Sequence, residues 1–405
     1  MIDKNIIKTC FEHFLKFGVL KTQVRCANLT SMQKYKESLP KNFYHVYPYS
    51  AMLKITSACN LRCKHCFYSG TPEIYNSDCD YNIDEWINIV NFLVDEFNIL
   101  NLIITGGEPF LKKDFLKLIK HVKQKSIPLV IQTNGTLLDE KVVDELATLL
   151  YCKTDSIQIS LEASNADAHE LIRGKGTFDK TIKAIKLLRV KNIPVQLNLT
   201  LTSISAPTIK DIFKLCVDLG ISNVSINRFT VCFEEQEYLN LSLEELFYYS
   251  SQIYQELEKY PMINARIKAL NIFDFLKNDY GRDLVDEFLL KNPDRVRLKR
   301  CLACHNHNKL TIASNGNVYL CSMDESEETI LGNIREKNLV EIWENRYLNP
   351  YFQERNIETI ACKNCKYIAL CQGGCIVNAY KKYGDINMPD AECPYSEEYL
   401  RSQNG

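Results

Sequence analysis

Short apolar segments alternate with longer amphipathic segments between about residue 50 and residue 235. The short segments have the length of strands, and the longer ones repeat apolar residues with the period of a helix. This alternation predicts a parallel sheet with helical connections. The predicted strands are Ala51–Thr56, Leu102–Thr105, Leu129–Thr133, Ser156–Leu161, Val195–Leu201 and Asn223–Phe229. The predicted helices between them include Asp114–Lys125, Asp139–Leu150, Phe178–Val190 and Pro207–Leu219.

Six strand–helix units are too few to close an eight-stranded barrel, so the pattern predicts an α/β fold with a partial (β/α)6 TIM-like barrel. In such folds the active site gathers at the carboxyl ends of the strands. We assign this barrel to residues 49–235. Residues 1–48 are expected to form an N-terminal extension with one amphipathic helix at Lys8–Phe17. Residues 236–297 are expected to form a helical bridge of two or three helices, and residues 298–405 a cysteine-rich domain.

The bulk composition is that of a soluble globular protein. The chain has 405 residues, of which 46% are hydrophobic and 24% charged, and its net charge is −1. Without a basic block there is no electrostatic reason to expect a nucleic-acid partner. No signal peptide and no run of about 18 uncharged apolar residues is present, so we expect no membrane span and a cytoplasmic location.

Cysteine is unusually frequent, with 17 residues. Three lie at residues 59–66 and eight between residues 301 and 393. Disulfides suit small secreted domains, so this clustering favours bound metal. The other cysteines are expected to be ordinary residues, most often buried; they are Cys10, Cys26, Cys79, Cys152, Cys216 and Cys232.

A C-x3-C-x2-C motif directly follows the first predicted strand. It is formed by Cys59, Cys63 and Cys66. Three thiolates can hold three irons of a [4Fe–4S] cluster and leave the fourth iron open, whereas clusters that only carry electrons normally have four thiolates. The motif therefore predicts chemistry at the cluster itself.

Gly106-Gly107-Glu108-Pro109 follows the second predicted strand. By itself this segment is typical of a strand-to-helix turn, although two glycines also let the backbone approach a ligand closely. Placed after the cysteine motif, it resembles the corresponding turn of the radical S-adenosylmethionine (radical SAM) enzymes. The resemblance covers roughly residues 50–235.

The resemblance implies that SAM binds the open iron and is cleaved by one electron to methionine and a 5′-deoxyadenosyl radical, which removes a hydrogen atom from the substrate. It also implies a reductase, flavodoxin or ferredoxin as electron donor. In this family the cysteine motif holds the cluster, the glycine turn holds the SAM amine and an aromatic residue lies beside the adenine. The matching residues are Cys59, Cys63 and Cys66 for the cluster, Gly106, Gly107 and Glu108 for the amine, and His65 for the adenine.

Two further segments resemble family motifs. Ser160-Leu161-Glu162 resembles a Ser-Leu-Asp segment near the SAM ribose, with Glu162 in place of the shorter aspartate. Arg173 begins a segment found in peptide-modifying members and is a candidate partner for the SAM carboxylate. A solvent-facing arginine at a helix start is the structural alternative. For Gln132–Gly135 a plain turn is favoured.

The C-terminal cysteines form the second motif. Gly316-x4-Cys321 precedes a C-x2-C-x5-C-x3-C run at residues 362–375, and Cys393 follows. With two cysteines near residue 301, the pattern resembles a SPASM domain, which carries two auxiliary [4Fe–4S] clusters. The resemblance implies one cluster held by Cys301, Cys304, Cys321 and Cys375, and another held by Cys362, Cys365, Cys371 and Cys393.

Two alternatives concern these ligands. The C-x2-C pair at residues 301–304 is tighter than expected, so Cys304, His305 or His307 could complete the first cluster, or one site could stay open. C-x2-C pairs also form zinc ribbons. The run as a whole and the companion barrel motif favour iron–sulfur clusters over zinc.

Most radical SAM enzymes with a SPASM domain act on peptides or proteins. The resemblance therefore implies a maturase of a ribosomally synthesised peptide that forms a crosslink, a thioether or an epimer. The alternatives are a sulfatase-maturase-like enzyme that forms formylglycine and, from another class, a non-catalytic zinc- or cluster-binding scaffold. Cys232, Glu234 and Glu235 follow the sixth strand and are candidates to donate a hydrogen atom or take a proton. A buried cysteine and solvated glutamates are the alternative.

Overall fold

The computed structural model describes residues 2–17, 47–67, 79–291, 309–321, 325–349, 355 and 359–397. The chain divides into two compact units. The barrel unit comprises Tyr47–Ala269 and Lys309–Ser322. The terminal unit, so named because it contains both chain ends, comprises Met1–Val46, Leu270–Asn308 and Met323–Gly405.

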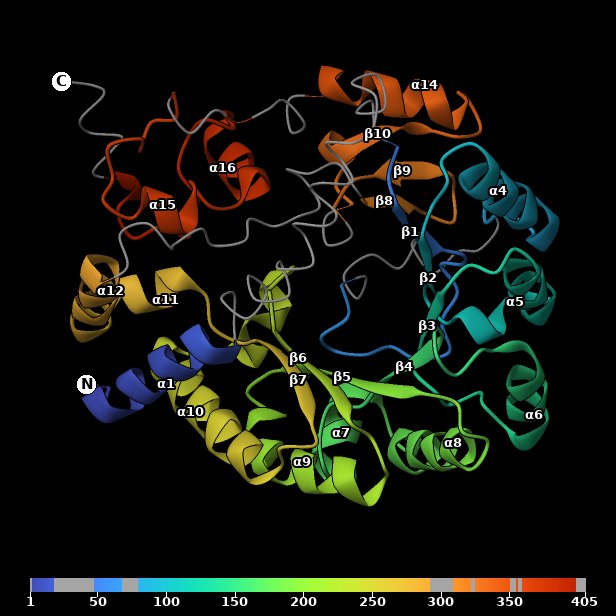
Figure 1. Ribbon diagram of the computed structural model, residues 1–405, viewed down its shortest axis with the longest axis horizontal. Coiled ribbons are helices and arrows are strands. Elements are labelled where there is room, and N and C mark those ends of the chain that lie inside the picture. The colour runs from blue at the N-terminus through green and yellow to red at the C-terminus, as the bar shows by residue number, and fades with distance from the viewer. Residues whose placement is uncertain are drawn as a thin grey trace. The chain divides into compact units, whose positions relative to one another are not determined.

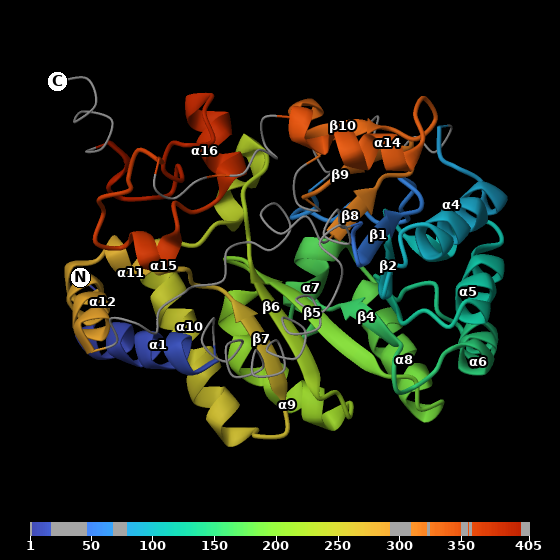
Figure 2. The ribbon, with the colours of Figure 1, turned by 45° about the horizontal axis from the view of Figure 1, so that its top comes forward.

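The barrel unit is built on a largely parallel sheet, in which all six predicted strands are present. Within the unit the strand order is β9-β8-β1-β2-β3-β4-β5-β6-β7, and the turned view in Figure 2 shows β4 to β7 side by side. The partial α/β barrel is therefore confirmed. The strands are β1 Ser50–Lys54, β2 Asn101–Thr105, β3 Leu129–Thr133, β4 Ser156–Ser160, β5 Val195–Leu201, β6 Asn223–Arg228, β7 Asn264–Lys268, β8 Lys309–Ile312 and β9 Asn317–Tyr319.

Two parts of this sheet were not expected from the sequence. β7 lies in the region predicted to be helical, and its sequence Asn-Ala-Arg-Ile-Lys has no apolar run that would mark a strand. β8 comes from the cysteine-rich end of the chain and pairs in parallel with β1. β9 then folds back antiparallel to β8. The C-terminal region thus contributes strands to the barrel sheet.

Helices follow the strands and cover the outside of the sheet (Figure 1). Several begin at a side-chain cap. In α4 the Asn82 side chain accepts from the Glu85 N–H, and the Glu85 carboxylate accepts from the Asn82 N–H, which is a capping box. Asp139 and Asn165 cap α6 and α7. The described α-helices of the unit are α4 Ile83–Asp95, α5 Phe115–Gln124, α6 Glu140–Leu149, α7 Ala166–Arg173, α8 Thr177–Val190, α9 Ile209–Asp218 and α10 Leu243–Lys259.

The two faces of the sheet differ in chemistry. Along β5 every second residue, such as Leu197 and Leu199, is fully buried against the helices. The residues between them, such as Asn198 and Thr200, are half-buried and point to the inner face. Parallel registers align the strands, so their carboxyl ends meet at one edge and bring the following loops together.

The terminal unit contains the predicted N-terminal helix, α1 Lys4–Phe17. Phe11 of this helix meets Phe275 and Phe288 edge-on, with ring centroids 5.2 and 6.1 Å apart. In the part of the chain that the structure describes, no helix is long and apolar enough to cross a membrane. The other α-helices and the strand that the structure describes in this unit are α11 Ile272–Leu276, α12 Asp279–Lys291, β10 Ile330–Asn333, α14 Leu339–Glu344, α15 Ile368–Cys371 and α16 Ile376–Tyr383.

Candidate active site

The loop that carries Cys59, Cys63 and Cys66 leaves the carboxyl end of β1 and lies against the glycine turn after β2. The Gly107 N–H donates to the Thr56 carbonyl at 2.7 Å, and the Glu108 N–H donates to the Ala58 carbonyl at 2.8 Å. A Cβ on Gly107 would lie 2.2 Å from the Ala58 oxygen, which no side chain tolerates. The glycine turn therefore holds the cysteine loop by direct backbone contact, just before its first cysteine.

The three cysteines of the loop share one electrostatic environment. Burial raises the pKa of Cys59, and it raises the pKa of Cys63 to about 11. For Cys63, Arg173 opposes the rise, whereas Cys66, Glu162 and Cys59 add to it. Because the charges of neighbouring thiolates add to the raised pKa values of Cys59 and Cys63, a bound cation would stabilise the thiolates of this loop. This donor set fits the iron–sulfur cluster that the motif predicts.

Glu108 is fully buried and connects the glycine turn to the turn after β3. Its carboxylate accepts from the Thr133 hydroxyl at 2.7 Å, from the Asn134 N–H at 2.8 Å and from the Phe110 N–H at 3.1 Å. Burial raises the pKa of Glu108, and these hydrogen bonds oppose the rise. Three acceptor positions are filled from within the chain, so the observed role of the side chain is to join two loops. A contact between Glu108 and the SAM amine remains a prediction.

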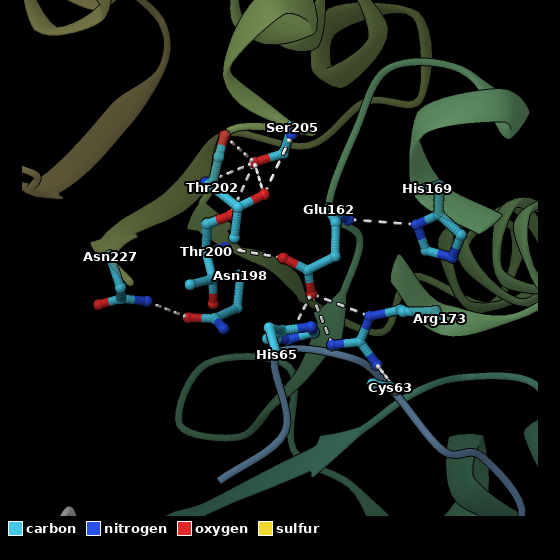
Figure 3. Close-up of polar contacts among 10 residues, drawn as sticks. All are labelled: Cys63, His65, Glu162, His169, Arg173, Asn198, Thr200, Thr202, Ser205 and Asn227. Atoms are coloured by element: carbon cyan, nitrogen blue, oxygen red, sulfur yellow. Dashed lines mark hydrogen bonds and ion pairs between the residues drawn. The ribbon is translucent and has the colours of Figure 1, made fainter. Parts of the chain in front are cut away.

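Glu162 and Arg173 form a buried ion pair beside the cysteine loop (Figure 3). Nε and Nη2 of Arg173 donate to one carboxylate oxygen of Glu162 at 2.9 and 2.6 Å. The other oxygen accepts from the Thr200 N–H at 2.8 Å, and His65 Nε2 lies 3.5 Å from the carboxylate. Nη1 of Arg173 points to the Cys63 sulfur at 3.8 Å. The pair thus links α7, β5 and the cysteine loop.

The charge state of this pair follows from its burial and from the charges beside it. Burial by itself raises the pKa of Glu162, but Arg173 and then His65 bring it below its ordinary value. Burial by itself lowers the pKa of Arg173, but Glu162 and Cys63 raise it above its ordinary value. Both groups are therefore charged at neutral pH. Arg173 is buried at the end of α7, so the solvent-facing alternative is wrong.

His169 was not expected from the sequence and supports Glu162 from the other side. Its Nδ1 accepts from the Glu162 backbone N–H at 3.2 Å, so the neutral ring carries its proton on Nε2. Nε2 is buried without a partner among the described residues. Burial lowers the pKa of His169 to about 4, which keeps the ring neutral. Glu162 lies in the loop between β4 and α7, and His169 lies seven residues further along in α7, a relation that no sequence motif marks.

Gln236 was also missed, and it fastens the segment after β6 to the cysteine loop. Its Nε2 donates to the carbonyls of Lys64 and Cys66, both at 3.0 Å, and its Oε1 accepts from the Cys232 N–H at 3.2 Å. The side chain is only 4% exposed. Because glutamine has both donors and an acceptor, it can make all three bonds.

The candidate proton- and hydrogen-handling residues lie on this segment. Cys232, Glu234 and Glu235 are all exposed, so the expectation of a buried cysteine at this position is wrong. Glu234 and Glu235 begin the short 3-10 helix Glu234–Leu239. Ser160 is half-buried at the end of β4. The catalytic and cofactor-binding roles of these residues remain predictions.

Four of the C-terminal cysteines lie together in the terminal unit. Burial raises the pKa of Cys371 to about 12 and that of Cys393 to about 11, and in both cases the charges of Cys362 and Cys365 add to the rise. Burial raises the pKa of Cys362 as well, and Arg355 opposes it. These are the four cysteines that the resemblance assigned to one auxiliary cluster.

The loop beside these cysteines is held by a buried arginine and a buried aspartate. Nη1 of Arg355 donates to the carbonyls of Gly373 and Gly374 at 2.8 and 3.2 Å. Asp390 accepts from the Cys375 N–H at 2.6 Å. Gly374 has φ +71°, and a Cβ there would lie 2.4 Å from Asp390. The two glycines are therefore required for the close approach of these chain segments.

The other auxiliary cysteines are separate in the chain. Cys321 follows β9 in the barrel unit and is half-buried. Burial lowers the pKa of Lys54 to about 8, against the opposing charges of Cys321 and Cys66, so both thiols lie near this lysine. Cys301 and Cys304, with His305 and His307, lie outside the described residues.

Within the described ranges, no three His, Cys, Asp or Glu side chains are arranged to hold a single metal ion.

Two family models match the chain. The Radical SAM superfamily model matches residues 53–216, and the SPASM model, described as an iron-sulfur cluster-binding domain, matches residues 301–366. An AdoMet-dependent heme synthase of Methanosarcina barkeri is 25% identical over 354 residues, which are 84% of this chain and 95% of that protein. A PqqA peptide cyclase of Granulibacter bethesdensis is 24% identical over 362 residues, 86% of this chain and 88% of that protein.

The fold is similar to that of SuiB from Streptococcus suis, in a crystal structure with its precursor peptide SuiA. The TM-score is 0.67 at 20% identity, over 90% of this chain and 81% of SuiB. The matched family models, the partial barrel and the two cysteine groups agree. The chain is a radical SAM enzyme with a C-terminal SPASM domain. Membership implies SAM and a [4Fe–4S] cluster as cofactors, with auxiliary iron–sulfur binding in the SPASM domain.

Proposed function

We propose that this enzyme is a maturase that modifies a ribosomally synthesised peptide, by forming a crosslink, a thioether or an epimer. When bound, SAM and its cluster supply a 5′-deoxyadenosyl radical that removes a hydrogen atom from the substrate. Cys59, Cys63 and Cys66 would hold the cluster. Glu162 binds Nε and Nη2 of Arg173 and thereby orients its Nη1 toward Cys63, where the cluster would lie.

The observation that carries the proposal is the inner face of β4 to β6, where every inward position is polar. The inward positions of neighbouring strands carry amides that bond to one another, such as Gln132 to Gln158 at 2.8 Å and Asn227 to Asn198 at 2.9 Å. The interior of a packed barrel is filled by valine, isoleucine and leucine instead. Amide and hydroxyl groups match the N–H and C=O groups of a polypeptide. The peptide cyclase relative and the SuiA complex support the same substrate class.

A tetrapyrrole substrate is the second candidate, because the heme synthase relative aligns over 95% of its length. A flat macrocycle of this size requires apolar and aromatic side chains against its two faces. The polar inner face of β4 to β6 favours the peptide. A sulfatase-maturase-like activity is a third possibility, which a sulfatase encoded beside the enzyme would support.

For the auxiliary clusters, we propose that Cys362, Cys365, Cys371 and Cys393 hold one, and that Cys321 and Cys375 contribute to the other with Cys301 and Cys304. Three clusters of four irons predict about twelve irons per chain after anaerobic reconstitution. A reductase, flavodoxin or ferredoxin would supply the electron.

The test is turnover by the reconstituted full-length enzyme with SAM, a reductant and the precursor peptide encoded beside it. We expect 5′-deoxyadenosine and a changed peptide, measured by liquid chromatography with mass spectrometry. Loss of two hydrogens indicates a crosslink or thioether, and uptake of deuterium from heavy water indicates an epimer. Cleavage of SAM without any change in the peptide, together with turnover of an iron porphyrin, would replace this proposal by the tetrapyrrole alternative.

A further inference from the structure

On the inner face of the barrel sheet, the uncharged polar side chains of β6 give way to basic side chains at β7. The parallel register pairs Ser225 with Arg266 and Asn227 with Lys268, so both basic residues point to the same side as the inward residues of β6. Both are exposed. Across the described strands β1 to β7, no inward position carries aspartate or glutamate. This end of the inner face is therefore a basic surface next to an amide-lined one.

Among the described strands, β7 is also the edge of the sheet. In the part of the chain that the structure describes, the strand order ends at β7, which pairs with β6 alone. An edge strand presents a row of N–H and C=O groups to which an extended peptide can add as a further strand. Backbone pairing of this kind tolerates many sequences, and the side chains that flank it provide the selectivity.

We propose that β7 and its basic residues bind an extended acidic segment of the peptide substrate. This inference rests on the proposed peptide-modifying function and names the chemistry of the substrate. In an added strand, side chains two residues apart point to the same side. Two carboxylates at positions i and i+2 would thus meet Arg266 and Lys268, and the arginine can bind its partner through two parallel hydrogen bonds.

The position of β7 suits delivery to the cysteine loop. Asn227, the register partner of Lys268, bonds to Asn198 of β5, and Thr200 of the same strand donates to Glu162 (Figure 3). Neighbouring strands are about 4.8 Å apart, so a strand added to β7 would lie roughly 14 Å from β5. An extended chain covers that distance in about four residues. A substrate bound at β7 through its acidic segment would therefore reach β5, which contacts Glu162, within a few further residues.

The competing explanation is protection of the sheet edge. Natural edge strands often carry lysine, because charge discourages pairing with other copies of the chain. Protection requires charge but no preference for a particular ligand. Binding predicts a preference for acidic over neutral peptides that disappears when the two charges are removed.

The test compares two fluorescein-labelled peptides, one alternating threonine and glutamate and the other alternating threonine and glutamine. Each is titrated with reconstituted full-length enzyme and followed by fluorescence anisotropy in about 50 mM salt, where charge contacts are weakly screened. We expect the acidic peptide to bind at least about tenfold more tightly than the neutral one. The double variant Arg266→Gln/Lys268→Gln should abolish this difference.

The matched control is Lys183→Gln/Lys186→Gln, which removes two exposed positive charges from the outer helix α8. It should keep the preference. Equal binding of both peptides, binding of neither, or a preference that survives in the β7 variant would overturn the inference. Modification of the precursor peptide is measured separately, so a failure of the proposed function is distinguished from a failure of the acidic site.

Discussion

The cysteine groups of the two units lie in different surroundings. In the barrel unit, Cys59, Cys63 and Cys66 lie beside a buried ion pair, Glu162 with Arg173, and Arg173 Nη1 points to a cysteine sulfur. In the terminal unit, four thiols lie beside a glycine loop whose carbonyls are bound by Arg355.

This difference corresponds to two ways in which cysteines bind an iron–sulfur cluster. Four thiols can complete a cluster by themselves, and the surrounding groups then have only to hold the loops. Three thiols leave an iron for another molecule, and charged side chains near them can bind and orient it. We therefore expect the barrel group to be required for SAM cleavage and the terminal group for the later steps on the peptide.

The largest expected effect compares Cys63→Ala with Cys371→Ala. The Cys63 variant should lower SAM cleavage to the background of an enzyme-free control, because a ligand of the SAM cluster is lost. The Cys371 variant should still form 5′-deoxyadenosine but no modified peptide. Each variant should lose about four irons per chain. Equal loss of SAM cleavage in both variants would contradict the division of roles.

The second prediction concerns the buried ion pair. Glu162→Gln leaves Arg173 buried without a counter-charge, which should lower the free energy of unfolding by about 3–5 kcal/mol. The control is Asp144→Asn, which breaks an exposed pair with Lys191 and should change stability by less than about 1 kcal/mol. Anaerobic denaturant titration measures both. Similar midpoints for the two variants would show that the buried pair is not structurally important.

Gln236→Glu is expected to act mainly on the coupling between SAM cleavage and modification of the peptide. A carboxylate opposite the carbonyls of Lys64 and Cys66 cannot donate to them, which should cost about 1–3 kcal/mol and loosen the third cysteine. The ratio of 5′-deoxyadenosine to modified peptide should rise. Glu237→Gln, at the exposed neighbouring position, is the control and should keep the wild-type ratio. An unchanged ratio in Gln236→Glu would show that Gln236 does not contribute to the coupling of SAM cleavage to peptide modification.

The smallest effect is a pH dependence. The pKa of His169 is about 4 when folded, below its ordinary value of about 6.5, so its contribution to stability is complete above pH 6.5 and is lost as pH falls toward 4. Between pH 7 and pH 5.5 this should amount to about 1 kcal/mol. His169→Gln should show a shallower fall of the unfolding midpoint over this range. A slope equal to that of the wild type would exclude His169 as the cause.

Much of the barrel was predictable because its strands are buried apolar segments between amphipathic helices. β5 and β6 were predicted to within one residue of their observed ends. β7 was missed for the opposite reason: it is the edge of the described sheet, and every second residue of it is polar and exposed. β8 could not be placed, because its pairing with β1 joins segments about 260 residues apart.

For the site, the sequence identified the residues of local motifs but not the contacts that these residues make. The spacing of Cys59, Cys63 and Cys66 is fixed within eight residues, and it marks a cluster without any knowledge of the fold. The partners of Glu162 and Gln236 depend on loops from different strands meeting at one edge. Spacing along the chain contains no information about that meeting.

The sequence by itself determined the class of the enzyme, because metal ligands and glycine turns are local requirements of the chemistry. Only the tertiary structure decided that Arg173 is buried with Glu162, and that the glycine turn clamps the cysteine loop. It also decided that the basic strand β7 lies at the end of the sheet that the described strands form. The physical reason is that burial, charge pairing and strand pairing depend on segments that are distant in the chain and come together only on folding.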